Sequence, residues 1–338
     1  MEMKLTVQAA FTGLGGALVT QITDYADVTQ EVEITTNRLD APGKMTFSCL
    51  EEGTIRIREG SAVECTVDGI TMFKGFVMTA ERTRGGETTY TAYDQLRYLK
   101  ANASYAFEQM TLSQIIRQIA ADFGLAVGTL ADTGYVFPCL VKENEECLDI
   151  IFDALAQTIV QTGKIFLFYD DGGKLTLIEA KELFQQTLFG EGSLVTDYTY
   201  KRDIDSDTYN RIKLVKKNEE SGRTDVYIHE DTDTIKKWGI LQYYDEVDEN
   251  MNEAQVDELC RLYLQYYNRV LQTLTLEALG VVSVRAGSII PVRINGIEDL
   301  SVSRLLLAEK VVHNFEGDNH TMKIEVKSFE QLGGESIA

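Results

Sequence analysis

Apolar and polar residues alternate along most of the first hundred residues, with the period of two that half-buried β-strands require. Residues 3–9 alternate in this way, and residues 45–49 do so again after the turn signal Pro42-Gly43. Further short strands are predicted at 54–58, 62–67, 70–84 and 87–93. Residues 1–101 are therefore predicted to form a first small β-barrel module.

The period changes to that of an α-helix beyond this module. Apolar residues from Leu112 to Phe123 share one helical face, and Thr111 with Gln114 gives a capping-box pattern at its start. A second helix is predicted over 147–162, and a hairpin follows it at 165–178. Residues 102–194 are therefore predicted to form an α+β module.

Strands return near residue 195 and continue to about residue 329, with one more helix between them. This helix is predicted over 252–270, where Asn252 and Gln255 form its capping pair. We assign residues 195–332, helix included, to a second β-barrel module, and residues 333–338 to a frayed end. The predicted fold class is α+β and β-dominated, with two related small β-barrel modules and an intervening α+β module.

Residues 58–70 and 285–297 repeat one pattern in a constant register. The matching turn positions are Gly60, Ser61, Asp68 and Gly69 in the first segment, and Gly287, Ser288, Asn295 and Gly296 in the second. Asp-Gly and Asn-Gly both tolerate the positive φ of tight hairpins. The match is predicted to extend to Ala80-Glu81 and Ala308-Glu309. Unrelated β-regions also share such turns, but the constant register favours an internal duplication with a structural role.

The chain is acidic, with a formal net charge of -21 and a pI near 4.6. Such a surface repels phosphate backbones and anionic lipid, which disfavours binding to nucleic acid or to a membrane surface. No apolar stretch approaches the length needed to cross a bilayer. The five cysteines form no C-x-x-C pair, and buried thiols in a reducing compartment, the cytoplasm, are the simplest interpretation.

No residue pattern assigns a catalytic, cofactor-binding or metal-binding role. The three histidines, His229, His313 and His320, form no cluster with cysteine. Asp203, Asp205 and Asp207 suggest a calcium loop, but an EF-hand would need glycine and glutamate where the chain has Thr208 and Leu214. No cofactor is therefore predicted.

The stretch from Trp238 to Cys260 contains seven carboxylates within residues 245–258 and no lysine or arginine. Two interpretations stay open. These residues form either a solvated loop and helix start, where acids favour the helix dipole, or a charged docking face or lumen wall.

Several local stretches resemble the XkdQ-type proteins of defective prophages and tail-like bacteriocins, part of the wider late-control-D hub group. This group also includes phage tail hubs and the N-terminal part of the type VI secretion spike protein VgrG. The stretches that carry the resemblance are 111–116, 123–125, 147–151, 162–164, 172–175, 210–214, 238–242 and Arg285-Ala286-Gly287-Ser288. The resemblance spans nearly the whole chain, and this family has no catalytic residues to carry over.

The resemblance implies a homotrimer in which two tube-like β-barrel modules per chain make a pseudo-six-fold ring. Such a ring would join a six-fold tail tube to a three-fold spike in the baseplate of a contractile tail. The implied partners are the tail tube protein, the spike protein, a tape-measure protein and a LysM-type baseplate protein. The protein would be present in the bacterial cytoplasm during assembly and then in the particle, which could be a phage, a bacteriocin or another injection device.

Two alternatives to a structural hub remain. A tail-associated peptidoglycan hydrolase would need two carboxylates across a sugar cleft, and the 53 acidic residues leave many accidental pairs. A carbohydrate-binding β-protein would need exposed stacking platforms, whereas the chain has one tryptophan, Trp238.

Overall fold

The computed structural model describes residues 1–12, 18–50, 57–218, 223–247, 251–297 and 304–328. Part of the strand predicted at 54–58, the predicted frayed end at 333–338, and Asp248 and Glu249 of the acidic stretch lie outside these residues. The chain divides into two compact units. Unit 1 comprises Met1–Tyr198 and Thr275–Ala338, and unit 2 comprises Thr199–Leu274.

The first part of unit 1 is an antiparallel sheet with the strand order β3-β4-β7-β6-β5-β1-β2. Its strands are β1 (Met3–Thr12), β2 (Leu18–Asp24), β3 (Thr29–Asn37), β4 (Lys44–Leu50), β5 (Ala62–Val67), β6 (Ile70–Arg82) and β7 (Glu87–Tyr93). The alternation predicted from the sequence appears directly as burial: in β4, Met45, Phe47 and Cys49 are buried and the residues between them are not. One face of the sheet therefore forms a continuous apolar core.

The α+β part packs two helices beside short strands around a separate core. Its elements are β8 (Asn102–Thr111), α1 (Leu112–Asp122), β9 (Val127–Leu130), β10 (Val136–Glu146), α2 (Cys147–Thr162), β11 (Phe166–Asp170) and β12 (Leu175–Glu179). The capping box at Thr111 and Gln114 is confirmed, with the Gln114 N–H donating to the Thr111 hydroxyl. Gly163 ends α2 in the left-handed conformation that glycine adopts readily.

The last part of unit 1 repeats the strand order of the first. Its strands are β13 (Phe189–Gly190), β14 (Val195–Asp203), β18 (Leu271–Leu279), β19 (Ile289–Arg293), β20 (Arg304–Glu316) and β21 (Asn319–Ser328), and the chain passes from unit 1 to unit 2 within β14 and back within β18. They are arranged as β14-β18-β21-β20-β19-β13, which corresponds position by position to β3-β4-β7-β6-β5-β1. The two sets differ in the direction of one strand: β13 pairs with β19 in parallel, whereas β1 pairs with β5 antiparallel.

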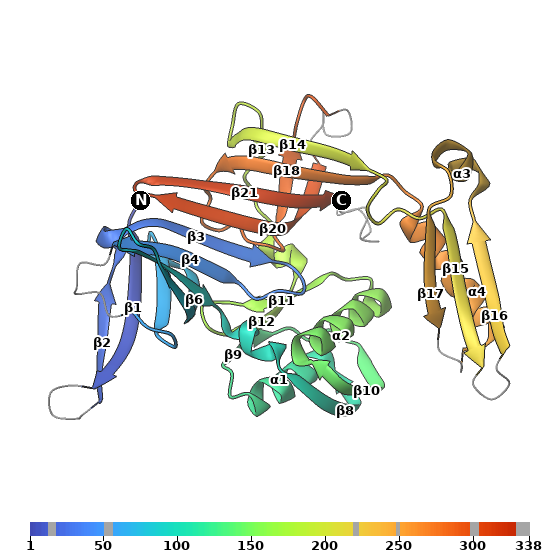
Figure 1. Ribbon diagram of the computed structural model, residues 1–338, viewed down its shortest axis with the longest axis horizontal. Coiled ribbons are helices and arrows are strands. Elements are labelled where there is room, and N and C mark those ends of the chain that lie inside the picture. Colours follow the sequence, from blue (N-terminus) through green and yellow to red (C-terminus); the bar gives the residue numbers. More distant parts are fainter. Residues whose placement is uncertain (13–17, 51–56, 219–222, 248–250, 298–303, 329–338) are drawn as a thin grey trace. The chain divides into compact units, whose positions relative to one another are not determined.

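The β-dominated fold class is confirmed, but the described strands contain no closed barrel. Instead, β20 pairs antiparallel with β3, and this pairing, which we call the β3–β20 seam, fuses both strand sets into one 13-stranded sheet (Figure 1). Lys310 to Glu316 face Asn37 to Glu31 along this seam. The physical reason is that half of one edge of β20 pairs with a strand of the other set. Neither set therefore closes on itself.

A buried ion pair ends the β3–β20 seam. The Arg38 Nε lies 3.0 Å from both carboxylate oxygens of Glu309, and the two side chains are only 7% and 16% exposed. The Arg38 N–H also donates to the Glu309 carbonyl, at 2.9 Å. Charge pairing and backbone pairing therefore hold the seam together.

Unit 2 has its own small core. A three-stranded sheet of order β16-β15-β17 carries helix α4 (Glu253–Tyr267) on one face. The other elements are β15 (Arg211–Asn218), β16 (Arg223–Glu230), α3 (Thr232–Trp238) and β17 (Gln242–Val247). Val256 and Cys260 of α4 are buried with Ile212 and Leu214 of β15.

The placement of this helix differs from the expectation that 252–270 belongs to the second barrel module. In chain order, unit 2 is an insertion between β14 and β18, whereas a short connection joins β3 to β4. The apolar stripe of α4 predicted a helix that needs a sheet to pack against. That sheet is β15–β17, which lies within the insertion.

Removing the Glu309 carboxylate should be costly. Glu309→Ala leaves the Arg38 charge buried without its partner, and the expected loss is about 3–5 kcal/mol of unfolding free energy. Glu277→Ala is the matched control, since Glu277 pairs with Lys323 at 3.9 Å where both side chains are more than half exposed. That control should cost less than about 1 kcal/mol. Urea unfolding measures both, and equal losses would contradict a buried, energetically important pair.

Candidate functional site

The Gly-Ser turns of the two strand sets make the same hydrogen bonds. The Gly60 N–H donates to the Val77 carbonyl at 2.7 Å, and the Val77 N–H donates to the Ser61 carbonyl at 2.9 Å. In the second set, the Gly287 N–H donates to the Ala308 carbonyl at 2.7 Å and the Ala308 N–H to the Ser288 carbonyl at 2.9 Å. The two turns thus anchor β6 and β20 in the same way.

The serine hydroxyls and the backbone conformation of the glycines explain the residue types. The Ser61 and Ser288 hydroxyls each accept the N–H of the arginine three residues earlier, at 3.1 Å in both turns. Gly60 has φ +81° and Gly287 has φ +91°, a conformation that costs other residues free energy. Both serines are buried.

A β-bulge lies one residue beyond the residue to which each turn is hydrogen-bonded. The register of β6 against β7 shifts at Met78, one residue after Val77, and that of β20 against β21 shifts at Glu309, one residue after Ala308. Val77 therefore corresponds to Ala308, and the predicted match of Ala80-Glu81 with Ala308-Glu309 is wrong. The cause is a longer connection between β19 and β20 than between β5 and β6.

The two Asx-Gly turns differ. Asp68 (φ +49°) and Gly69 (φ +80°) form the tight turn between β5 and β6. Asn295 and Gly296 do not have positive φ, so that expectation is wrong for the second copy. A Cβ at Gly296 would lie 2.5 Å from the Tyr198 hydroxyl, so this glycine serves close packing instead.

A buried polar cluster joins three segments of unit 1, and the sequence did not indicate it. We call it the acid junction: Asp94 and Gln95 after β7, Asp170 at the end of β11, and Arg285 before β19. The Gln95 amide donates to the Asp170 carboxylate at 2.7 Å, and its carbonyl accepts the Ala126 N–H at 2.9 Å. The acid junction therefore ties the α+β part to both strand sets.

Arg285 approaches this cluster through its aromatic neighbour and a backbone oxygen. Its guanidinium carbon lies 3.7 Å from the centre of the Tyr169 ring, and both terminal nitrogens donate to the Asp170 carbonyl, at 3.3 and 3.2 Å. The Arg285 Nε is buried with no hydrogen-bond partner. Burial lowers the pKa of this guanidinium.

The two carboxyls of the acid junction are hard to ionise together. Burial, with the nearby Asp170 charge, raises the pKa of Asp94 to about 8, although the Gly43 and Leu96 N–H groups donate to it at 2.8 and 3.0 Å. Burial also raises the pKa of Asp170, which accepts from Gln95 and Gly173. The pair is enclosed, and its contacts connect segments of the fold.

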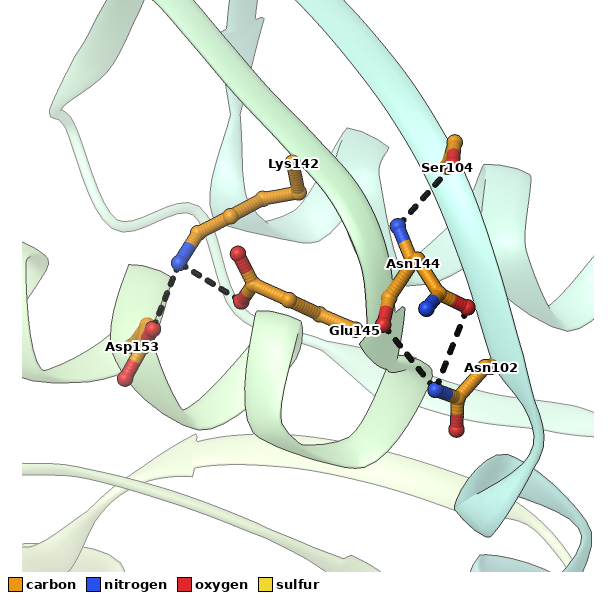
Figure 2. A network of polar contacts seen from close by, with 6 residues as sticks. All are labelled: Asn102, Ser104, Lys142, Asn144, Glu145 and Asp153. Carbon is orange, nitrogen blue, oxygen red and sulfur yellow. Dashed lines mark hydrogen bonds and ion pairs between the residues drawn. The ribbon is translucent and has the colours of Figure 1, made fainter.

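A second network fixes the antiparallel β8–β10 pair against α2 (Figure 2). The Lys142 ammonium reaches Glu145 at 2.9 Å and Asp153 of α2 at 2.7 Å. The Asn102 amide donates to the Asn144 carbonyl at 2.9 Å, where Asn144 takes φ +54° at a bulge in β10. These contacts stabilise a bulged strand and are structural.

The histidines have structural or local partners. His313 is buried and donates through Nε2 to the Val284 carbonyl at 2.7 Å, so its Nδ1 accepts from His320 at 2.9 Å. Burial lowers the pKa of His313 to about 4. His229 contacts Asp257 at 2.7 Å. Within the described ranges, no three His, Cys, Asp or Glu side chains are placed to hold a metal ion.

Local partners also satisfy the aspartates and acidic residues considered above. Asp203 accepts from Lys201 and the Asp205 N–H, which hold the pKa of its carboxyl well below the usual range. In the acidic stretch, four of the carboxylates have partners within unit 2; these are Asp245 with Tyr243, Glu246 with Lys217, Asp257 with His229, and Glu258 with Arg261. None of the described helices is long and apolar enough to span a membrane.

The sequence profile of the YQBQ-like family matches residues 32–327. YqbQ of Bacillus subtilis (strain 168) is 31% identical over 306 residues, which cover 88% of this chain and 92% of the relative. The phage-like element PBSX protein XkdQ of the same strain is 30% identical over 307 residues, with the same coverage.

Solved structures show the same fold at low identity. The 43 kDa tail protein of prophage MuSo2 from Shewanella oneidensis superposes with a TM-score of 0.68 and 14% identity, covering 97% of this chain and 99% of that one. The E. coli c3393 protein, described as a type VI secretion component similar to the T4 tail proteins gp27 and gp5, gives a TM-score of 0.52 at 10% identity. That superposition covers 99% of this chain and 79% of that one.

The acid junction makes a pH-dependent contribution to stability. Asp94 holds its proton up to about pH 8 when folded but only to about pH 4 when unfolded, so the folded state binds more protons between these values. Stability should therefore fall as pH rises through that window, by more than about 1.4 kcal/mol, the equivalent of one pKa unit. Denaturant unfolding at pH 5 and pH 8 measures this fall. Asp94→Asn should flatten it, whereas Asn at the exposed Asp318 should leave it unchanged; an unchanged slope in Asp94→Asn would contradict the assignment.

Replacing the turn glycines should have graded effects. Gly60→Ala forces alanine to a positive φ and should cost about 1–2 kcal/mol. Gly287→Ala should cost more, because its Cβ would also lie 2.7 Å from the Leu167 side chain. Gly85→Ala, at ordinary φ with its nearest neighbour 3.7 Å away, should change the unfolding free energy by less than about 0.5 kcal/mol. Thermal unfolding ranks the three, and a harmless Gly287→Ala would contradict the packing described.

Proposed function

This chain belongs to the YQBQ-like family, and from that premise we propose that it is a structural protein of a phage-type tail. More specifically, it is the baseplate hub of a contractile tail or tail-like bacteriocin. Three copies form a pseudo-six-fold ring that joins the tail tube to the three-fold spike. Support comes from the relative XkdQ, named as a protein of a phage-like element, and from a fold shared with a prophage tail protein.

The observation that carries the hub proposal is the internal match between the two strand sets. They share a strand order, the hydrogen bonds of the Gly-Ser turn, and a bulge one residue after Val77 and Ala308. Two similar surfaces in one chain, repeated three times about an axis, give six similar docking positions. This number suits a six-fold tube on one side, while the chain count suits a three-fold spike on the other.

Open sheet edges are consistent with barrels that need neighbours. Among the described strands, β2 and β14 end the main path of the 13-stranded sheet and β13 ends its branch, and each has one strand partner. Exposed edges are liabilities that proteins usually cover or pair. In the proposed ring, the two tube-like β-barrel modules are completed by contacts between chains.

The proposed partners follow from the position of a hub. They are the tail tube and spike proteins, a tape-measure protein that passes through the ring, and a LysM-type baseplate protein. The net charge of -21 would keep DNA or a passing chain from sticking to the ring. Assembly would take place in the bacterial cytoplasm, before the protein becomes part of the particle.

A structural role also accounts for the enclosed pair of carboxyls with raised pKa values in the acid junction. Asp94 and Asp170 are 6% and 7% exposed, so a cell-wall polymer has no access to them. Their hydrogen bonds run to Gly43, Leu96, Gln95 and Gly173, within the fold. This pair therefore lends no support to a peptidoglycan hydrolase.

The proposal predicts a trimer in solution. Size-exclusion chromatography with light scattering should give three times the 37.9 kDa of one chain. The fraction of trimer should rise with protein concentration. If the free protein is monomeric, adding purified tube or spike protein should produce the trimer. A chain that stays monomeric at high concentration and binds neither protein would contradict a hub role.

A further inference from the structure

The β3–β20 seam has a counterpart on β6 for which the described strands supply no second strand. On β20, the residues before the bulge pair with β19 and those after it pair with β3 on the same edge. On β6, the residues before the bulge pair with β5 in the same way, as far as Ala62 opposite Phe76. Beyond the bulge, Thr79 to Glu81 pair with β7, and no described strand lies on their other edge.

The exposure of residues 79–81 shows what a further strand on this edge of β6 would cover. Counted from the bulge, Ala80 corresponds to Val311, which β3 and β21 leave 0% exposed. Thr79, Ala80 and Glu81 are all exposed. Residues 79–81 therefore occupy the same position on β6 as the seam residues do on β20, but their side chains are exposed.

The strand equivalent to β3 is β14, and no described strand lies along its outer edge. The Leu279 N–H donates to the Leu194 carbonyl and the Thr196 hydroxyl to the Glu277 carbonyl, so β14 runs antiparallel to β18 as β3 does to β4. β3 continues the sheet to β20, whereas β14 ends it. Each strand set thus offers one half of a seam: the first has an open acceptor edge on β6, and the second an open donor strand in β14.

We propose that β14 of one copy pairs antiparallel with residues 79–81 of β6 in a second copy, which repeats between chains the seam that joins the two strand sets within a chain. This rests on the proposed function and specifies its interface. The contact is head-to-tail, so it continues from copy to copy and closes when the rotation per chain is one third of a turn. Intrachain and interchain seams then alternate around six modules.

One opposite-charge pair lies across this pairing. Transferring the register of the β3–β20 seam places the exposed Arg202 of β14 opposite Thr79, on the same face as the exposed Glu81, while Lys201 lies opposite Ala80 on the other face. Opposite charges across neighbouring strands stabilise a pair, and like charges destabilise it. The buried Arg38–Glu309 pair is not repeated, since Met78 occupies the position equivalent to Glu309. The interchain seam is accordingly the weaker one, as assembly from separate chains requires.

Cysteine cross-linking tests the interface on the full chain. The background variant is Cys139→Ser, because Cys139 is the exposed cysteine and the other four are buried. The test variant adds Ala80→Cys and Lys201→Cys, both at exposed positions, and is treated with a short bismaleimide at a concentration where light scattering shows the trimer. Directly opposite residues lie close enough to be bridged, so covalent trimers should form about tenfold faster than in the control.

The control pairs Lys201→Cys with Thr20→Cys, at an exposed position on the other open edge, β2. Covalent trimers from the Ala80 pair and not from the Thr20 pair support the proposal. Trimers from the Thr20 pair would overturn it in favour of edge-to-edge contact between β2 and β14. A trimer by light scattering that neither pair cross-links would overturn this interface while leaving the hub role intact. A chain that neither trimerises nor cross-links, alone or with tube and spike protein, would overturn both.

Discussion

The β3–β20 seam is the contact on which the arrangement of unit 1 depends. Lys310 to Glu316 pair with β21 of their own set on one edge and with β3 of the other set on the other edge, so the two sets share one sheet. The Thr36 hydroxyl on β3 accepts the Ala286 N–H, which links the same seam to the Gly-Ser turn of the second set. The bulge residue Glu309 adds a buried charge pair. Strand order, turn and bulge all meet at this place.

The acid junction imposes a second constraint, which is electrostatic. It connects the α+β part to both strand sets through buried groups whose partners come from distant parts of the chain. Two carboxyls and a guanidinium share this enclosed site, and burial opposes the charge on each of them. The fold tolerates this arrangement because backbone N–H groups, the Gln95 amide and the Tyr169 ring surround the charges. These residues hold distant segments of unit 1 together.

The sequence predicted the elements better than their assembly. Alternation around Met45 and the capping box at Thr111 are local properties, and both appear in the structure. The apolar stripe of the helix predicted at 252–270 does not identify the sheet against which the helix packs. A helix in an insertion and a helix in a barrel module would have the same stripe. The match at Gly60 and Gly287 is visible in sequence, yet its continuation to Val77 and Ala308 is hidden by a longer loop. The acid junction has no sequence signal, since its members are separated by most of the chain.

Within the YQBQ-like family fold, the central claim is that one chain supplies two equivalent positions, so that three chains make six. Electron cryo-microscopy of the assembled ring, viewed along its axis, tests this most directly. We expect six similar wall densities at low resolution that separate, at higher resolution, into three pairs, each pair being one chain joined by the β3–β20 seam. Six separate chains in the ring, or three chains without a six-fold repeat in the wall, would contradict the account.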